Sequence, residues 1–581
     1  MTGDSIALAA SEARAPAQPV DRKDYRSVDE GRGSRMNGMN HASAHETRWI
    51  LDGLHLAIAV AAFSFSLFKW DNQVWIAAWA GPVLLLRFTR THRWLPAALL
   101  GFAILELALG IGFLQMFARL DMQTMAGNMS PALMIEGALK AGTMVLALAF
   151  LAPFIADKVL HRRLPHAVSH LAFPSAWVTV EWLYSFNVGT LYCLGQSQAA
   201  LPPLVLASSV FGMHGLSFLI AWSASMINLL WENGWNVRAL RVPGLVHAGT
   251  VALTLTYGAL AVVLPRRAER TAPVAGIVLD ARFEERLYSS GFSFLDPKVS
   301  LAEYSAQLRS PAAHIDEVRR KTLDAVRAGA KIIVWQEYAL TLDAVVADAL
   351  LAEMKDLADE ADVYLLVSYA RLLAQDERHG KQILRNLGVL FTPEGRKAWE
   401  YAKAYPITGT EDYAVEAGAR RIPHLDTPYG RIGQVICFDM HFPQYLRQAA
   451  LDHIDLLFSP SVDGRAFTPM ATLNHAYRAV ESGFTLVRIT GDGLSAVVDP
   501  SYRFWAARDT FEQGTGSLYC DVPVISRRTF YAAYGFLLPH CVCLLLITLI
   551  VVASIRSARH MSGAGPVSSA RSSGTADTPA Q

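Results

Sequence analysis

Charged residues are scarce in this chain. Lysine, arginine, aspartate and glutamate make up only 18% of its 581 residues, whereas they make up about a quarter of a typical soluble domain. Neither sign is in excess, because 52 basic residues are balanced by 51 acidic ones and the net charge is +1. This balance offers no overall attraction to nucleic acid, so we expect no nucleic-acid partner. The low charge also indicates that much of the chain avoids water.

Cysteine is scarce as well. The five cysteines form neither a disulfide framework nor the paired spacing of a zinc site. We therefore expect no bound metal and no cofactor. Four cysteines stand in apolar or strand-like surroundings, where a free thiol usually serves as a small packing group. These four are Cys193, Cys520, Cys541 and Cys543, and the fifth is Cys437.

Apolar residues are abundant, at 52%, and they gather in long runs. A run of about 20 apolar residues can cross a bilayer, and without water it must do so as a helix. We predict seven spans within residues 47–265 and an eighth near the C-terminus. Their approximate ranges are 49–68, 73–88, 95–118, 131–155, 171–187, 204–230, 246–264 and 534–555.

Basic residues indicate how these spans are oriented. Arginines and lysines follow spans two, four, six and eight, whereas the alternate short connections hold few. Cytoplasmic loops carry such an excess, so both termini are expected in the cytoplasm. The opposite orientation is favoured by Arg270 and its neighbours and by Arg527 and Arg528. These residues flank a long translocated segment, where the charge rule is weaker. The basic residues that decide are Arg87, Arg90, Arg93, Lys158, Arg162, Arg163, Arg238, Arg241, Arg556 and Arg559.

Between spans seven and eight, strand-like and helix-like patterns alternate, which is typical of an α/β domain. Strands are predicted at 274–279, 332–335, 363–367, 387–391, 433–437, 456–458, 485–489 and 495–498, and helices at 314–328, 347–361, 443–451 and 468–482. The predicted organisation is a disordered cytoplasmic tail (1–46), a membrane domain (47–265), an α/β domain (273–524), a closing span (534–555) and a second disordered tail (556–581).

A few ionisable residues fall within or near the predicted spans, where they are functional candidates by default. Glu136 and Lys140 are four residues apart on one helix, so they either neutralise each other or have a role of their own. Glu181 either has a role or only orders the uncharged loop that follows it. Trp177 and Trp182 are interpreted as anchors at the membrane interface.

Cys437 stands between a predicted buried strand and a helix that Pro443 begins. Open α/β sheets place reacting groups at such strand ends. A single cysteine is nevertheless more often an inert packing residue, because reactivity requires neighbours that lower its pKa or accept its proton.

Three further residues are candidates for the neighbours that would make Cys437 reactive. Glu337 follows the apolar strand at 332–335 and is a candidate general base, although it could instead cap the next helix. Lys403 could supply positive charge to an oxyanion, or it could be an ordinary surface lysine. Glu411 could orient Lys403 or be a plain loop charge.

In the order Glu337, Lys403, Cys437, these residues resemble the Glu-Lys-Cys triad of the nitrilase (carbon-nitrogen hydrolase) superfamily. Residues 436–443, with Asp439 after the thiol, resemble the cysteine elbow of that superfamily. The resemblance implies an α-β-β-α sandwich. Together with the eight predicted spans, the chain resembles the apolipoprotein N-acyltransferase family. Further matching segments are 176–182, 194–198, 212–217, 478–481 and 493–500.

The resemblance implies an enzyme of a bacterial inner membrane, with its catalytic domain on the periplasmic side. Such an enzyme takes an acyl chain from a phospholipid as a Cys437 thioester and passes it to the N-terminal amine of a diacylglyceryl-cysteine lipoprotein. Glu337 would act as base and Lys403 would stabilise the oxyanion, with Glu411 and Asp439 in support. Aromatic content suggests a lid over the lipid entry at residues 288–307 and near Tyr413.

The chain departs from the family pattern beside the triad. Gln336 replaces a proline, Asp439 replaces a glutamate, Leu279-Asp280-Ala281 ends a strand that usually ends in Gln-Gly-Asn, and the loop after Lys403 is altered. These changes leave open a membrane-tethered nitrilase-type amidase. A non-catalytic scaffold or a transporter is the third possibility, and the complete triad argues against it.

Overall fold

The computed structural model describes residues 50–69, 73–117, 143–264, 268–279, 309–310, 312–378, 382–408 and 411–563. By internal contacts the chain divides into Met1–His55 and Leu56–Gln581, and the following account concerns the second unit. The predicted pair Glu136 and Lys140, the predicted lid at 288–307 and the tail at 1–46 lie outside the described residues, as does the side chain of Tyr413.

Four helices of the described residues are long and apolar enough to cross a membrane. The other apolar helices that match predicted spans are 15 to 17 residues long, so eight spans are not established. The four candidate spans are Trp94–Met116 in α3 (Trp94–Phe117), Pro202–Glu232 (α9), Val237–Val263, which includes α10 (Arg241–Val263), and Leu537–Arg559 in α18 (Leu537–Gly563). The shorter helices are Ile50–Ser66, α2 (Ala77–Thr91), α6 (Met144–Leu160) and α8 (Ala172–Val188).

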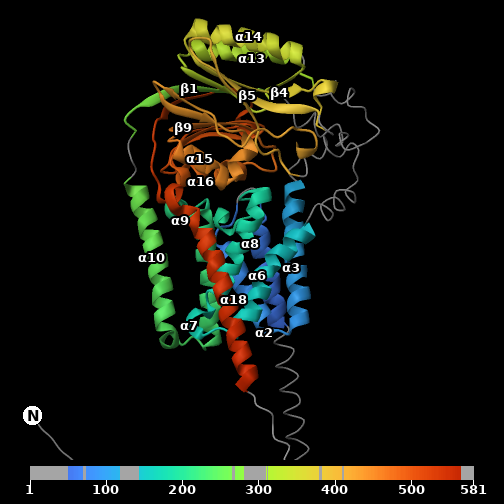
Figure 1. The fold of residues 1–581 in the computed structure, drawn as a ribbon, viewed down its shortest axis with the longest axis vertical. Helices are drawn as coiled ribbons and strands as arrows, with labels where there is room; N and C mark the ends of the chain where they lie inside the picture. The colour runs from blue at the N-terminus through green and yellow to red at the C-terminus, as the bar shows by residue number, and fades with distance from the viewer. Residues whose placement is uncertain are drawn as a thin grey trace, which may run out of the picture. The chain divides into compact units, whose positions relative to one another are not determined.

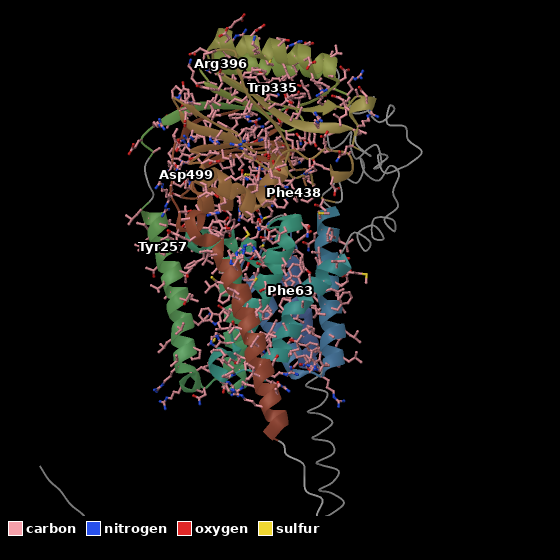
Figure 2. All side chains as sticks on the ribbon, in the orientation of Figure 1. Phe63, Tyr257, Trp335, Arg396, Phe438 and Asp499 are labelled. Atoms are coloured by element: carbon pink, nitrogen blue, oxygen red, sulfur yellow. The ribbon has the colours of Figure 1, made fainter. Side chains whose placement is uncertain are left out.

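The apolar helices pack around a core of large aromatic side chains, among them Phe63 (Figure 2). Trp177 of α8 lies inside this core, 1% exposed, against Phe150 and Phe154 of α6. The prediction that Trp177 anchors the interface is therefore wrong, because its ring fills the space between helices.

A buried ion pair joins two of these helices. The guanidinium of Arg90, in α2, donates to both carboxylate oxygens of Asp157 in α6, at 2.7 and 2.8 Å. Arg90 is 5% exposed and lies inside α2, whereas the sequence placed it after the second span.

The α/β domain contains two sheets that pack face to face. One has the order β13-β1-β2-β4-β5-β6, with β3 beside β4, and the other has the order β12-β11-β10-β9-β8-β7. The first sheet consists of β1 (Thr271–Ile277), β2 (Ile332–Trp335), β3 (Leu340–Leu342), β4 (Tyr364–Leu372), β5 (Leu384–Phe391), β6 (Lys397–Ala402) and β13 (Leu518–Pro523). The second consists of β7 (His424–Thr427), β8 (Gly430–Gln434), β9 (Leu456–Val462), β10 (Thr485–Gly491), β11 (Leu494–Val498) and β12 (Phe504–Asp509).

Helices cover the outer face of each sheet (Figure 1). Helices α13 (Ala312–Arg327) and α14 (Ala344–Ala361) cover the first sheet, and α15 (Pro443–Leu451) and α16 (Met470–Ser482) cover the second. The result is the α-β-β-α sandwich that the sequence resemblance implied. Helix α16 in turn packs against α9, so the second helix layer faces the apolar helices.

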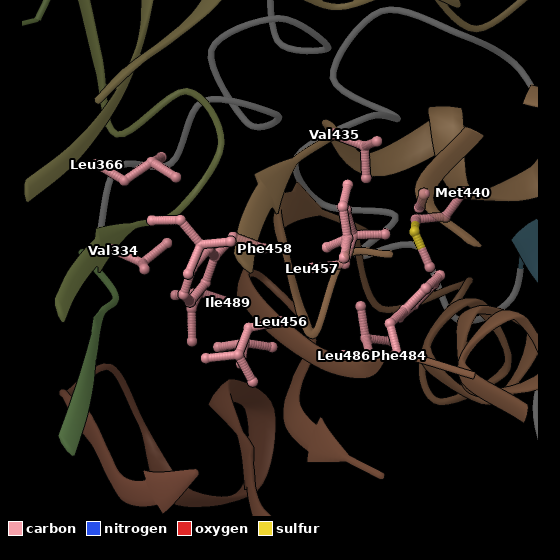
Figure 3. Close-up of a cluster of buried hydrophobic side chains, with 14 of the residues drawn as sticks. Val334, Leu366, Val435, Met440, Leu456, Leu457, Phe458, Phe484, Leu486 and Ile489 are labelled. Carbon is pink, nitrogen blue, oxygen red and sulfur yellow. The ribbon is translucent and has the colours of Figure 1, made fainter. Parts of the chain in front are cut away.

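The side chains of β2 alternate between two hydrophobic cores, one on each face of the sheet. Ile333 and Trp335 pack toward the helices α13 and α14. Val334 points the other way and joins the core between the sheets, with Phe458 of β9 and Ile489 of β10 (Figure 3). Because successive side chains of a strand point to opposite faces, a strand buried on both sides must be apolar throughout.

All eight predicted strands are present, although most of their bounds differ by several residues. The strand predicted to reach Cys437 ends earlier, at Gln434, and Cys437 begins a 3-10 helix, Cys437–His441. Five strands were not predicted, namely β3, β6, β7, β12 and β13, because they are short or carry charged residues at a sheet edge.

Candidate active site

Cys437 occupies a sharp turn between β8 and α15. Its backbone has a φ of 43°, in the left-handed region that costs a non-glycine residue about 1–3 kcal/mol. The turn holds the thiol in the interior, where its Sγ donates to the carbonyl oxygen of Val462 at 3.6 Å. Val462 is the last residue of β9, the strand parallel to β8. The side chain is 7% exposed.

Glu337 follows β2 and is 1% exposed. Its Oε2 accepts the backbone N–H of Val462 at 2.9 Å, so one residue of β9 contacts both the carboxylate and the thiol. Its Oε1 accepts from Lys403 Nζ at 2.9 Å and from Asn386 Nδ2 at 2.6 Å. The carboxylate is thus fixed by three donors from three different strands or strand ends.

Lys403 follows β6 and is fully buried. Its ammonium also donates to Glu411 Oε2 at 2.6 Å, in addition to Glu337. Glu411 is held in turn by the backbone N–H of Ile407 and by the hydroxyl of Tyr338, both at 2.9 Å. The structure therefore brings Glu337, Lys403 and Glu411 together in one ion-pair network.

Burial and charge set the protonation of this network. Burial alone would lower the pKa of Lys403, but Glu337 and then Glu411 more than offset it and raise that pKa well above its usual value. Burial raises the pKa of Glu337, against the opposing effect of Lys403. Burial, and then the charge of Glu337, raise the pKa of the Cys437 thiol well above its usual value. At neutral pH the lysine is charged and the thiol is protonated.

Asp439 connects the cysteine turn to the segment after Lys403. Its Oδ2 accepts from Tyr401 Oη at 2.5 Å and from the N–H of Ile436 at 2.9 Å, and its Oδ1 accepts from the N–H of Tyr405 at 2.8 Å. Burial raises the pKa of Asp439 to about 7, although these donors partly oppose the shift. Asp439 thus accepts hydrogen bonds from the backbone just before Cys437 and from the backbone just after Lys403, and so holds these two segments together.

Sequence reasoning missed several residues of this site. Asn386 is a polar residue inside the apolar strand β5, which is the one signal that could have identified it. Val462 contacts the site through its backbone N–H and C=O, so the identity of its side chain gives no signal in the sequence. Beside them, Arg488 donates to both Asp463 oxygens and to His475 Nδ1.

A buried thiol, a carboxylate and an ammonium arranged in this way suit acyl transfer through a covalent intermediate. The carboxylate can accept the proton of a thiol or of an incoming nucleophile. The ammonium can stabilise negative charge on a carbonyl oxygen. In the part of the chain that the structure describes, the group of side chains close enough to share a metal ion is Glu181, Cys193 and His214, and it does not include Cys437.

Two family models match the chain. The model of the apolipoprotein N-acyltransferase N-terminal domain matches residues 57–226, and the carbon-nitrogen hydrolase model matches residues 299–527. The apolipoprotein N-acyltransferase of Shewanella oneidensis is 26% identical over 396 residues, which are 65% of this chain and 73% of that protein. The apolipoprotein N-acyltransferase of Geobacter metallireducens is 25% identical over 427 residues, which are 68% and 76%.

Among solved structures, the amidase from Nesterenkonia sp. matches 46% of this chain and 94% of its own, with 17% identity and a TM-score of 0.35.

Proposed function

Because the chain belongs to the apolipoprotein N-acyltransferase family of the carbon-nitrogen hydrolase superfamily, we propose that it acylates lipoproteins through a Cys437 thioester. The acyl donor is a membrane phospholipid, and the acceptor is the N-terminal amine of a diacylglyceryl-cysteine lipoprotein. The roles that we assign to these residues rest on one observation: Val462 contacts both Cys437 and Glu337. Lys403 in turn pairs with Glu337 at 2.9 Å.

In the first half-reaction, Glu337 accepts the proton of the Cys437 thiol as Sγ attacks an ester carbonyl of the phospholipid. Lys403 stabilises the resulting oxyanion, and a donor of this kind contributes roughly 3–4 kcal/mol to lowering the barrier. The tetrahedral intermediate collapses, the ester C–O bond breaks, and the lysophospholipid leaves as an alcohol with the proton that Glu337 returns. The acyl chain remains on Sγ as a thioester.

In the second half-reaction, the amine of the lipoprotein attacks the thioester carbonyl while Glu337 accepts its proton. The C–S bond breaks, and the thiol of Cys437 is restored. Glu411 and Asp439 position the groups that react: Glu411 holds the ammonium of Lys403, and Asp439 holds the backbone around the thiol.

The protein is a membrane protein, and the proposed substrates explain why. Both acyl donor and acyl acceptor are anchored in lipid, so a site that serves them must open at the bilayer. We place the α/β domain on the periplasmic side of a bacterial inner membrane and both termini in the cytoplasm. In this proposal, residues 47–265 and 534–555 form the membrane domain and residues 273–524 form the catalytic domain.

The test is whether labelled phospholipid leaves its acyl chain on Cys437. Purified protein is incubated with phospholipid carrying a labelled acyl chain, and peptides are examined for a thioester that hydroxylamine removes. The wild type should retain label, Cys437→Ala should retain none, and Glu337→Gln should acquire it about 10²–10⁴-fold more slowly. The control Cys520→Ala should behave as wild type, since Cys520 lies on β13.

Addition of a diacylglyceryl-cysteine peptide should then discharge the label into an amide. A wild-type protein that never forms the thioester, or a Cys437→Ala variant that still transfers the chain, would refute the proposal. Turnover of small amides without any reaction with lipid would instead favour the amidase.

A further inference from the structure

Three buried side chains of different kinds meet beside the domain that carries Cys437. Glu181 comes from α8, Cys193 from the loop after it, and His214 from α9. One carboxylate oxygen, the thiol sulfur and one imidazole nitrogen all lie within 4.8 Å of one another. The three side chains are 0%, 1% and 3% exposed.

Two of these side chains carry a buried polar atom that makes no hydrogen bond. Glu181 Oε1 accepts from Trp177 Nε1 and from the N–H of Leu194, both at 2.7 Å, but its Oε2 has no hydrogen-bond partner. His214 Nε2 is also without a partner. Buried polar atoms of folded proteins are nearly always paired, so two unpaired polar atoms on members of one buried cluster indicate that a partner belongs there.

We propose that Glu181 Oε2, Cys193 Sγ and His214 Nε2 bind one zinc ion. Carboxylate oxygen, thiolate sulfur and imidazole nitrogen are the three ligand types that zinc prefers. Their separations require only small side-chain shifts to reach zinc–ligand distances of about 2.0–2.3 Å. Binding releases the thiol proton of Cys193, and the carboxylate and thiolate then balance the two charges of the ion. These three ligands leave the fourth position of a tetrahedral zinc for a water molecule.

The surroundings fit this assignment. Trp177 and Leu194 fix Glu181 through Oε1, which leaves Oε2 for the ion, and the hydroxyl of Tyr184 lies 3.7 Å from Cys193 Sγ as a donor to the sulfur. Outer partners of this kind orient metal ligands. The charge of the neighbouring Arg478 is compensated by Glu481, whose carboxylate lies 2.8 Å away.

The proposed ion would tie the 189–201 loop to two helices, and that loop supports the cysteine turn. The backbone N–H of Thr190 donates to the carbonyl of His441 at 2.8 Å, and Tyr477 Oη donates to the carbonyl of Gly195 at 3.0 Å. His441 is the last residue of the 3-10 helix that Cys437 begins. The zinc site therefore goes beyond the proposed reaction, since it would stabilise the structure that holds the thiol.

The test is the metal content of the full-length protein, purified in detergent without chelator. Mass spectrometry of the elements should find about one zinc per chain. Cys193→Ser and His214→Gln should lose most of it, whereas Cys520→Ser and Cys437→Ala should keep it. Retention by Cys437→Ala separates this site from the active site, so the two proposals can fail independently.

A second measurement does not depend on folding of the variants. In the wild-type protein, a chelator should lower the melting temperature and speed the alkylation of Cys193, mapped by mass spectrometry, without changing that of Cys520. Wild-type protein that contains no zinc after purification, and takes up none from micromolar zinc chloride, overturns the proposal. Equal zinc in wild type and both ligand variants overturns it too.

Discussion

At the scale of single residues, the charge balance of the site determines how the thiol can react. Lys403 carries one positive charge between the carboxylates of Glu337 and Glu411, so the buried network already has one negative charge to spare. A thiolate at Cys437 would add a second negative charge in a medium of low dielectric. The proton must therefore leave the thiol during the attack on the substrate, and Glu337, whose pKa burial raises, is suited to accept it.

Asp439 predicts a dependence of stability on pH. Its pKa rises from 3.8 in the unfolded chain to about 7 in the fold, because it is buried. A carboxyl group with a raised pKa stabilises the fold most below its unfolded pKa, and this contribution is lost as the pH rises through the folded pKa. Asparagine stays neutral, so the melting temperature of wild type relative to Asp439→Asn should fall by a few degrees between pH 4 and pH 7.

Thermal unfolding in detergent across that range measures the difference between the two proteins. The matched control is Asp521→Asn, on an exposed position of β13. A constant gap between wild type and Asp439→Asn, or a gap that widens in favour of wild type at higher pH, would contradict the prediction.

The sequence indicated the side chains of the site but not their connections. Glu337 and Cys437 follow apolar segments, which is why their positions could be inferred. Asn386 and the backbone of Val462 were missed, because they reach the site from strands that are distant in sequence. The cluster of Glu181, Cys193 and His214 was missed for the same reason, since its spacing matches no metal-binding signature.

At the scale of elements, helix α10 packs along α9 and comes very close to its backbone at one glycine. A Cβ atom at Gly258 would lie 1.8 Å from the carbonyl oxygen of Pro203, at the start of α9. Small residues permit this close approach of helices in membranes. Gly258→Ala should therefore separate the two helices and cost roughly 1–3 kcal/mol of stability.

Helix α10 supplies its own control. A Cβ atom at Gly249 would meet nothing within 4 Å, so Gly249→Ala should leave the melting temperature unchanged or raise it slightly. The two variants are compared by thermal unfolding in the same detergent. Equal stability of both variants would show that the helices can move apart without cost.

The helices and strands differ in how closely their predicted bounds match the observed ones. Strand β2 was predicted with its observed bounds, because four apolar residues in a row require burial on both faces. Strand β6, which leads to Lys403, was missed, because its lysine, glutamate and alanine residues conceal an edge strand. Helix α8 matches its predicted run within one residue at each end, whereas α2 begins inside the run that suggested a span and ends beyond it.

At the scale of the whole molecule, the proposed orientation predicts which surfaces a membrane-impermeant maleimide can reach. In a Cys541→Ser background, Arg396→Cys, in the exposed turn between β5 and β6, should be labelled in cells whose outer membrane alone is opened. Arg238→Cys, at an exposed position of the 3-10 helix Val237–Leu240 before α10, should be labelled only after the inner membrane is broken. Labelling in the reverse order would invert the proposed topology.

The double contact of Val462 has a consequence for how the enzyme tolerates motion. Its N–H donates to the carboxylate and its C=O accepts from the thiol, so a displacement of β9 would alter both contacts at once. The position of this one residue therefore sets the alignment of base and nucleophile together, and catalysis is sensitive to such small distances.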